Sequence, residues 1–306
     1  MSSKRNFVDL QVNGYKGIDF NSAELSLADI ERAAEEMMRD GVLHAFPTVI
    51  TNSVDHMSRC LSNLANAIDN SPIVAECFKG LHIEGPFLNN TQGFIGAHPP
   101  HHALEADEGA LNQLLEACQG KAKILTIAPE NDPNNKLIEL ATEQNLVVAA
   151  GHTDASREQL EAAIAAGLSL FTHLGNGCPQ QMHRHDNIIT RVLSLADQLS
   201  ISVIADGHHL PADLFRLFIK IIPVEKLIVV SDATSAAGLG PGKYQLAGRE
   251  IEVTSDGCAV DPELGNFLGS AQTLQQAQGW LRDEIKIPLE TELHLMKENA
   301  QRLMGL

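Results

Sequence analysis

Short apolar runs alternate with amphipathic helical patterns along the chain, and this alternation restricts the fold more than any other feature. Several runs are apolar at nearly every position, as the strands of a parallel sheet are when helices cover both of its faces. The runs that we expect to be strands are Phe7–Asn13, Val42–Ile50, Phe78–Glu84, Lys123–Ala128, Leu146–Gly151, Leu168–His173, Ile201–Ala205 and Leu227–Asp232. The helical patterns between them include Leu27–Arg39, Val54–Ile68, Asn134–Gln144, Ser156–Ala166 and Pro211–Ile221.

Eight strand-then-helix units predict an α/β fold of the (β/α)8 TIM-barrel type, although a doubly wound open sheet would show the same alternation. Two segments interrupt it: a long loop at Asn89–Ala106, and a Gly-rich stretch at Ala236–Asn266 in which Tyr244–Val253 predicts a hairpin. Two further helices are expected at Ala271–Ile285 and Glu290–Leu303. We therefore expect residues 1–306 to form one barrel domain, with a hairpin insertion near 236–266 and C-terminal helices within 271–303.

The charge of the chain excludes some classes of partner. A formal net charge of -17 repels nucleic-acid backbones and anionic lipid, so we expect neither partner. A small phosphorylated molecule is still compatible, because a few local cations or backbone N–H groups can hold one phosphate. The five cysteines form no C-x-x-C pair, and neither a signal peptide nor a run of about 18 apolar residues is present, so we expect a cytoplasmic protein.

Polar side chains follow one predicted strand after another, at the point where the strand ends. These residues are Glu84, His152, His173 with Asn176, Asp206 with His209, and Asp232. Each has an ordinary structural explanation when taken alone, such as a hydrogen-bonded histidine or a helix N-cap. Parallel strands of a barrel end at one rim, however, so we expect all of them in one pocket. Two imidazoles and a carboxylate are a usual catalytic zinc set, and Asp232 is a candidate to move the proton of a water molecule.

The segments around these residues resemble a known family. HIEGPF, GAH, GHTDAS, THLGNG, ADGHH and SDAT occur in the same order as the signature segments of N-acetylglucosamine-6-phosphate deacetylases, in the amidohydrolase superfamily. The resemblance runs from about Phe7 to Leu306 and includes FLGSAQTL and ENAQRLMGL. Where most amidohydrolases have a His-x-His pair on the first strand, these deacetylases and this chain have Gln-x-Asn, here Gln11 and Asn13. The resemblance therefore implies one principal metal ion.

The resemblance also implies a role for individual residues. Glu84, His152 and His173 would bind one divalent ion, with zinc as the default and iron, manganese, cobalt or nickel as alternatives. Asp232 would be the catalytic acid and base, and His98 would polarise the acetamido carbonyl. The residues that would contact the sugar phosphate are Ala97, His98, Asn176, Gly177, Arg184, His209, Phe267, Leu268 and Gly269. The family's phosphate-binding arginine can cross a subunit interface, so a homodimer is implied.

The chain departs from the family in two respects. We expect a barrel without the usual small β-sandwich, and Gly177-Cys178 stands where many relatives have Ala-Met. The expected activity is deacetylation of N-acetylglucosamine 6-phosphate. Three alternatives stay open: a substrate of different stereochemistry such as N-acetylgalactosamine 6-phosphate, another amide such as a cyclic ureide, and a non-catalytic sugar-phosphate sensor.

Overall fold

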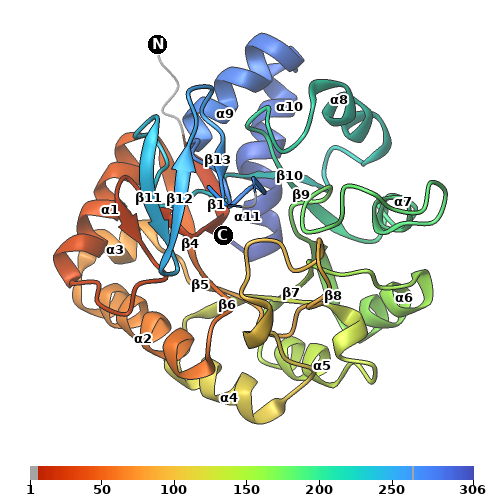
Figure 1. Cartoon of the computed structure of the whole chain (residues 1–306), viewed down its shortest axis with the longest axis horizontal. Helices are drawn as coiled ribbons and strands as arrows, with labels where there is room; N and C mark the ends of the chain where they lie inside the picture. The colour runs from red at the N-terminus through yellow and green to blue at the C-terminus, as the bar shows by residue number, and fades with distance from the viewer. Residues whose placement is uncertain (1–5, 264) are drawn as a thin grey trace.

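Eight parallel strands form one curved sheet surrounded by helices in the computed structural model, which describes residues 6–263 and 265–306 (Figure 1). In their order across the sheet, the strands are β1 (Phe7–Val12), β4 (Val42–Ile50), β5 (Leu81–Glu84), β6 (Ala122–Ile127), β7 (Val147–Ala150), β8 (Leu168–Phe171), β9 (Ser200–Ile204) and β10 (Leu227–Val230). All eight correspond to predicted strands, so the prediction of an α/β barrel is confirmed. That the chain forms one domain stays a prediction.

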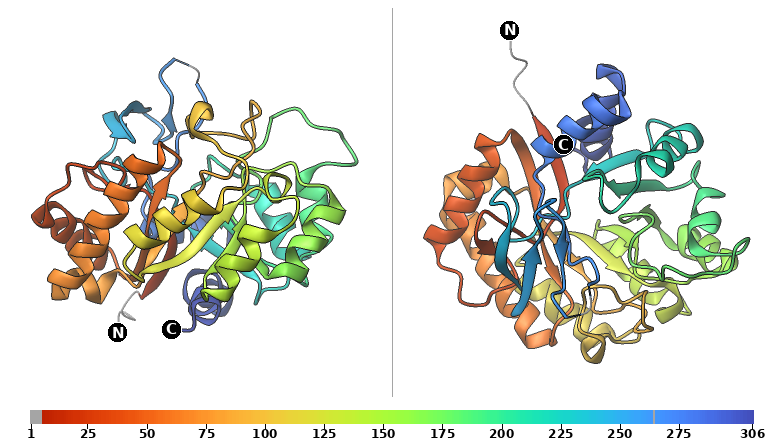
Figure 2. Two further views of the ribbon diagram at one scale, coloured as in Figure 1. Left: turned by 90° about the horizontal axis from the view of Figure 1, so that it is seen from below. Right: turned by 45° about the horizontal axis from the view of Figure 1, so that its top comes forward.

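Helices cover the outer face of the sheet (Figure 2). The helices are α1 (Leu27–Arg39), α2 (Val54–Asn70), α3 (Pro72–Cys77), α4 (Glu108–Ala117), α5 (Lys136–Glu143), α6 (Arg157–Ala166), α7 (Ile188–Leu193), α8 (Ala212–Ile221), α9 (Leu274–Trp280), α10 (Leu289–Leu293) and α11 (Asn299–Met304). The last of them, α11, covers one end of the barrel and not its outer face. The two predicted C-terminal helices each contain a π-helical turn, at Leu281–Ile285 and His294–Glu298. The predicted hairpin is present as β11 (Gly242–Leu246) and β12 (Arg249–Val253), and β13 (Ala259–Val260) pairs with β12.

One strand begins later than its sequence predicts. The apolar run from Phe78 predicts a strand, but Phe78 ends α3 and forms only a single bridge to Ala45. The ladder between β4 and β5 begins at the pair Thr48 and His82. A short helix begun by Pro72 takes up the preceding residues, since proline fits the first turn of a helix.

The sheet closes at one seam, between β1 and β10. The Asp232 N–H donates to the Gln11 carbonyl at 3.0 Å, and the Asn13 N–H donates to the Ala233 carbonyl at 2.7 Å. These bonds lie just beyond the end of β10, so they join the first and last strands at the rim where the chain's polar residues lie. An open sheet would leave these two strands as edges, and that alternative is therefore wrong.

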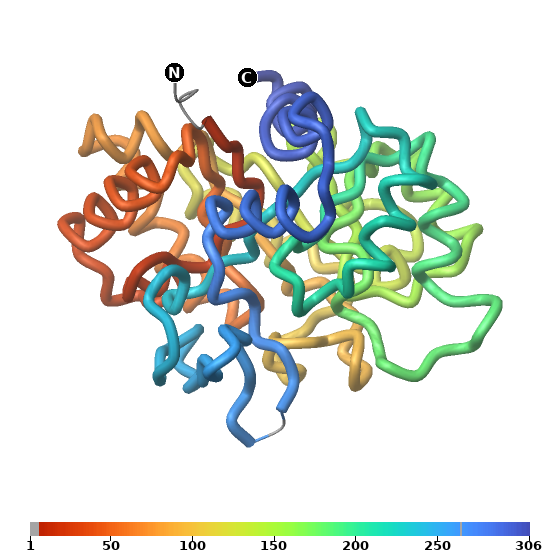
Figure 3. Tube along the Cα trace, turned by 90° about the horizontal axis from the view of Figure 1, so that it is seen from above, coloured from red at the N-terminus to blue at the C-terminus, as the bar shows by residue number. Residues whose placement is uncertain are grey.

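The interior of the barrel changes from apolar to polar along its axis. The apolar part includes Val8, Leu10, Phe46 and Ile228, and Ala300 of the C-terminal helix α11 belongs to the same cluster. Figure 3 shows this helix at the end of the barrel opposite the long loops. Beyond the apolar part, the buried His82 is held between the Leu10 carbonyl at 3.0 Å and the Thr126 hydroxyl at 2.7 Å. One end of the barrel is thus closed by apolar packing, and the other end can hold charged side chains.

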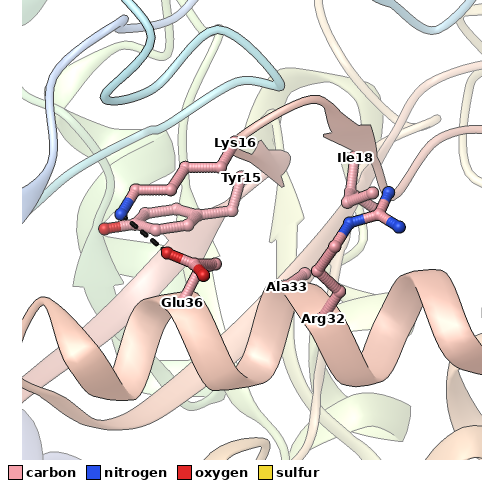
Figure 4. Close-up of a pocket in the computed structure, with 6 residues that line it drawn as sticks. All are labelled: Tyr15, Lys16, Ile18, Arg32, Ala33 and Glu36. Atoms are coloured by element: carbon pink, nitrogen blue, oxygen red, sulfur yellow. Dashed lines mark hydrogen bonds and ion pairs between the residues drawn. The ribbon is translucent and has the colours of Figure 1, made fainter.

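A short hairpin after β1, made of β2 (Gly14–Tyr15) and β3 (Ile18–Asp19), packs against α1. A hollow of about 160 Å³ lies between them, lined by Tyr15, Lys16, Ile18, Arg32, Ala33 and Glu36 (Figure 4). The Lys16 ammonium group forms ion pairs with Glu36 at 3.0 Å and with Asp40 at 2.8 Å. Because the Lys16 ammonium group already has two anionic partners, we assign these contacts a structural role: they hold the segment that follows Asn13 against α1. Among the described residues, no helix has both the length and the apolar character needed to span a membrane.

The seam predicts a dependence of stability on pH. The buried Asp9 carboxyl accepts from the Ser231 N–H at 3.0 Å, and burial raises the pKa of Asp9 to about 7. A raised pKa means that folding favours the protonated form, so this contribution to stability is full below about pH 4 and is lost as the pH rises through 7. Asp9→Asn keeps an acceptor but cannot ionise. We expect the free energy of unfolding of Asp9→Asn, relative to the wild type, to increase by about 2 kcal/mol between pH 5 and pH 8. Urea denaturation at both pH values measures this difference, and a constant difference would contradict the prediction.

Candidate active site

The carboxyl ends of four strands bring the predicted polar residues together at one rim. Glu84 is the last residue of β5, while His152, His173 and Asp232 each lie two residues beyond the ends of β7, β8 and β10. His98 comes from the loop between β5 and α4 and is also buried. The prediction that distant segments meet in one pocket agrees with these positions.

Three of these residues have a left-handed backbone. The φ angle is 51° at His152, 35° at His173 and 48° at Asp232. Side chains other than glycine seldom adopt this region, and each such residue costs on the order of 1 kcal/mol. The turn after each strand thus stores strain at the residues that face the pocket, which is where functional sites often keep it.

The Glu84 carboxylate is the centre of the pocket. Its Oε1 atom lies 3.1 Å from Nε2 of His173 and 3.5 Å from Nε2 of His152, and it accepts a hydrogen bond from the Gln11 amide at 2.8 Å. Burial alone would raise the pKa of Glu84, but the adjacent imidazoles of His152 and His173 hold it well below its usual range. A buried carboxylate that stays ionised next to two imidazoles is suited to a cation.

The histidine tautomers follow from backbone partners. Nδ1 of His152 lies 2.8 Å from the Phe94 carbonyl, which can only accept, so Nδ1 carries the proton and Nε2 keeps a lone pair. Nδ1 of His98 accepts from the Thr51 N–H at 3.2 Å, so in neutral His98 the proton is on Nε2. Burial, together with His152, lowers the pKa of His98 well below its usual range and keeps the ring neutral.

The tautomers determine which histidine nitrogens can bind a metal ion and which can only donate a hydrogen bond. The ligand atoms of Glu84, His98 and His152 lie within 4.8 Å of one another, and this spacing alone would suit a metal ion. However, the Nε2 of His98 carries a proton and points at His152 Nε2, 3.2 Å away, so it is a donor and not a ligand. His173, whose buried Nδ1 has no hydrogen-bond partner among the described residues, is the better third ligand. The residues present therefore fit a cation held by one carboxylate and two imidazoles.

Two glycines make room for the His152 ring. A Cβ atom at Gly96 would lie 3.0 Å from Cε1 of this ring, and one at Gly177 would lie 2.9 Å from its Nδ1. Both glycines also have a positive φ, at 58° and 60°. Only glycine can adopt this backbone conformation so close to the His152 ring. The glycine at position 177, where many relatives have alanine, is therefore explained by the packing of His152.

Asp232 is anchored to the end of β1. Its Oδ1 atom accepts from the Asn13 amide at 2.7 Å. Burial and the negative charge of Glu84 raise the pKa of Asp232 to about 6. A carboxyl group with a pKa near neutrality can both accept and return a proton at physiological pH.

A second polar cluster lies next to this site. The buried Asp206 carboxylate accepts from Nδ1 of His209 at 2.7 Å and from the Ser270 hydroxyl at 3.0 Å. The ring of His209 lies against Phe267, with 4.8 Å between centroids. Because Nδ1 donates to Asp206, Nε2 of His209 is free for another partner. The Ser270 N–H donates to the Asp232 carbonyl at 2.9 Å, so the predicted segment Phe267–Gly269 adjoins the pocket.

The other residues predicted to contact the substrate differ in their burial and in their position relative to the rim. Asn176 follows His173, and its buried Nδ2 has no partner among the described residues. Ala97 is partly buried next to His98, and Leu268 is buried. Arg184 is exposed on the loop between β8 and α7, and no described residue pairs with it. The single chain therefore gathers every predicted group at the rim except Arg184.

Sequence reasoning missed some of the supporting groups. The Thr172 hydroxyl donates to Oε1 of Gln11 at 2.6 Å and so fixes which end of that amide faces Glu84. The sequence analysis places Asp206 and His209 at the same rim, but it does not indicate that the Asp206 carboxylate accepts from Nδ1 of His209. Thr172 lies just beyond the end of β8, next to His173, and no local sequence pattern indicates its contact with Gln11.

Known proteins resemble this chain in sequence and in structure. It is 27% identical to the N-acetylglucosamine-6-phosphate deacetylase of Lysinibacillus sphaericus, over 98% of this chain and 76% of the relative. It is also 27% identical to the N-acetylgalactosamine-6-phosphate deacetylase of Escherichia coli O157:H7, over 98% of this chain and 77% of the relative. A solved variant of N-acetyl-D-glucosamine-6-phosphate deacetylase from Mycobacterium smegmatis, in complex with N-acetyl-D-glucosamine-6-phosphate, matches with a TM-score of 0.89. That match is 27% identical and covers 99% of this chain and 77% of the other.

No family model matches the sequence. The relatives nevertheless align with almost the entire chain, and the structural match extends over the strands that carry Glu84, His152, His173 and Asp232. The chain is therefore a homologue of the N-acetylglucosamine-6-phosphate deacetylases, in sequence and in fold.

Proposed function

We propose that the protein hydrolyses the acetamide bond of N-acetylglucosamine 6-phosphate, releasing acetate and glucosamine 6-phosphate in amino-sugar metabolism. The observation that carries this proposal is the rim cluster of Glu84, His152 and His173 with Asp232 beside it, in a chain homologous to deacetylases along 98% of its length. A sensor that only binds sugar phosphates would have no need of a carboxyl group tuned near neutrality.

Glu84, His152 and His173 would hold one divalent ion. When bound, such an ion acidifies water and polarises a carbonyl oxygen. The donor set of one carboxylate and two imidazoles favours zinc, although iron, manganese, cobalt or nickel also accept it. Gln11 already donates to Glu84 and accepts from Thr172, which supports a single ion.

Asp232 would perform the proton transfers. Its carboxylate accepts a proton from water as the water oxygen attacks the acetamido carbon. The same proton then passes to the nitrogen as the C–N bond breaks, so the amine leaves neutral. The Nε2–H of His98 would donate to the acetamido oxygen, on which negative charge develops.

The phosphate would lie at His209, whose Nε2 faces away from Asp206, with Asn176 and Gly177 contacting the sugar phosphate. We also infer a homodimer in which Arg184 of one subunit reaches the phosphate in the other. The exposure of Arg184 on a loop beside the rim supports this inference. The cysteines are free among the described residues, which supports a reducing compartment such as the cytoplasm.

N-Acetylgalactosamine 6-phosphate is a second candidate substrate, because a deacetylase of that sugar is as similar to the chain as the glucosamine enzyme is. Acetate release should be measured for both phosphosugars, for their unphosphorylated forms and for a cyclic ureide, on protein of known metal content. We expect efficient turnover only with an acetylated hexosamine 6-phosphate, slow turnover of the unphosphorylated acetylated sugars, and loss of all turnover after chelation. Tight phosphosugar binding without any turnover would instead favour a sensor.

Asp232→Asn should abolish most of the activity. Loss of a general acid and base lowers kcat by about 10²- to 10⁴-fold, while the Kd for the substrate should change little. In the wild type, kcat/KM should fall as the pH drops through about 6, because the ionised form of Asp232 is the active one. Wild-type-like acetate release by Asp232→Asn would remove this residue from the mechanism.

Asp206→Asn should act on binding of the phosphate. Removing the carboxylate takes away the acceptor of Nδ1, so His209 loses its orientation. We expect KM for the phosphorylated sugar to rise by about tenfold, the value of one charged hydrogen bond, with a smaller change in kcat. The control is slow turnover of the unphosphorylated sugar, which should be the same in both proteins. An equal loss with both sugars would contradict this role.

The proposed contact between subunits can be tested by complementation. Arg184→Ala and Asp232→Asn should each be weakly active as pure homodimers. In a mixed dimer, the subunit that keeps Asp232 receives Arg184 from its partner, so one site is complete. An equal mixture that has exchanged subunits should regain about a quarter of wild-type activity, since half of its dimers contain one such site. No gain despite exchange would place Arg184 in its own subunit's site or outside the site.

A further inference from the structure

The hairpin β11–β12 forms one wall of the barrel mouth. It is drawn in light blue over the end of the barrel in Figure 1, and it lies at the same end as the long loops in Figure 2. Its buried residues Leu246, Ile251 and Val253 form an apolar cluster with Ile50 at the end of β4, and Ala97 packs against this cluster. The hairpin therefore rests on the loop that carries His98.

The hairpin is fastened at its turn. The carboxylate of Asp19 accepts from the Ala247 N–H at 2.8 Å, and the Ser235 hydroxyl donates to the Gln245 carbonyl at 2.5 Å. These bonds hold the hairpin to the β2–β3 hairpin and to the segment that follows Asp232. The position of β12 relative to the rim is thus well defined.

Arg249, the first residue of β12, crosses from the hairpin to the active-site loop. Its Nη1 donates to the Ala97 carbonyl at 2.8 Å, and its Nη2 pairs with the Asp261 carboxylate. The guanidinium group suits this double contact, because its N–H groups point in fixed directions. The Arg249 side chain therefore connects the loop before His98 both to β12 and to the segment that leads to Phe267.

The Ala97 carbonyl belongs to the peptide group that leads into His98. On the side away from His152, His98 is held by its N–H, which donates to the Ile95 carbonyl at 3.2 Å, and by Nδ1, which accepts from the Thr51 N–H at 3.2 Å. Both of these contacts are long for hydrogen bonds, while the bond from Arg249 is of ordinary length. The contact with Arg249 also links His98 to the chain segment that begins at Asp232.

We propose that Arg249 is a positioning residue for His98, which fixes the Ala97–His98 peptide so that Nε2–H of His98 points at the reacting carbonyl. The inference rests on the proposed function, because it assigns Arg249 an effect on that reaction. Arg249 touches neither the reacting atoms nor Glu84, His152 or His173. Its removal should therefore lower the rate through His98 and leave the proposed metal ligands in place.

The test is a double-mutant cycle with Arg249→Met and His98→Gln. Arg249→Met should lower kcat by roughly tenfold or more, since small displacements of catalytic groups are costly, with less than a threefold change in KM. In the His98→Gln background the same substitution should have almost no further effect, because the group that Arg249 positions is gone. Added guanidinium ion should restore part of the activity of Arg249→Met.

Lys243→Met is the matched control. Lys243 lies on β11 and pairs with Glu250 on the same hairpin at 2.7 Å, and among the described residues it makes no hydrogen bond or ion pair with the active-site loop. We expect wild-type kcat and KM for this variant.

If Arg249→Met fails to fold, Arg249→Lys takes its place in the cycle, with a smaller decrease expected because one ammonium group cannot reproduce the fork. Equal losses from Arg249→Met with and without His98 would overturn the proposal, as would wild-type kcat in Arg249→Met. Absence of acetate release by the wild type would instead refute the proposed function itself.

Discussion

The site depends on one buried negative charge, the Glu84 carboxylate. A charge in this position is costly unless it is paired, and the barrel supplies its partners from three other strands. Gln11 lies on β1, His152 follows β7 and His173 follows β8. A side-chain nitrogen of each lies within 3.5 Å of Oε1 of Glu84. Such convergence requires a sheet that closes on itself, because β1 and β8 are separated by four strands on one path and by β9 and β10 on the other. The rim bonds between β1 and the end of β10 are therefore as much a part of the site as its side chains.

The same rim concentrates backbone strain. His152, His173 and Asp232 all have positive φ, two residues after the ends of strands that are mostly buried. A strand that continued in extended geometry would point its next side chain along the barrel wall. The left-handed turn instead directs it over the mouth, and the packed strands and helices below hold this unfavourable geometry in place. The left-handed turn thus gives a reason why the candidate active-site residues lie just beyond the strand ends.

The sequence predicts the barrel well and its supporting contacts poorly. Apolar periodicity locates β4 and α1 at their observed bounds, because burial on both faces and amphipathic spacing are local properties. The order of polar residues after strands likewise predicts the meeting of Glu84 with His173. By contrast, no local pattern indicates that Arg249 reaches the Ala97 carbonyl, 152 positions away in the chain, or that His98 accepts from Thr51. Such contacts depend on how loops cross the mouth, which periodicity does not describe.

The amide pair on β1 explains how a barrel of this type can do without a second imidazole pair. Gln11 uses both ends of its amide, donating to Glu84 while accepting from Thr172, and Asn13 donates to Asp232. An amide nitrogen has no free lone pair, so neither residue can act as a metal ligand through the atom that faces the carboxylates. Instead, each places a neutral donor against a negative charge. The Gln11 amide thereby prepares the Glu84 carboxylate to bind a cation, and the Asn13 amide prepares the Asp232 carboxyl group to exchange a proton. Residues of the first strand thus determine which carboxyl group is suited to be a metal ligand and which is suited to be a base.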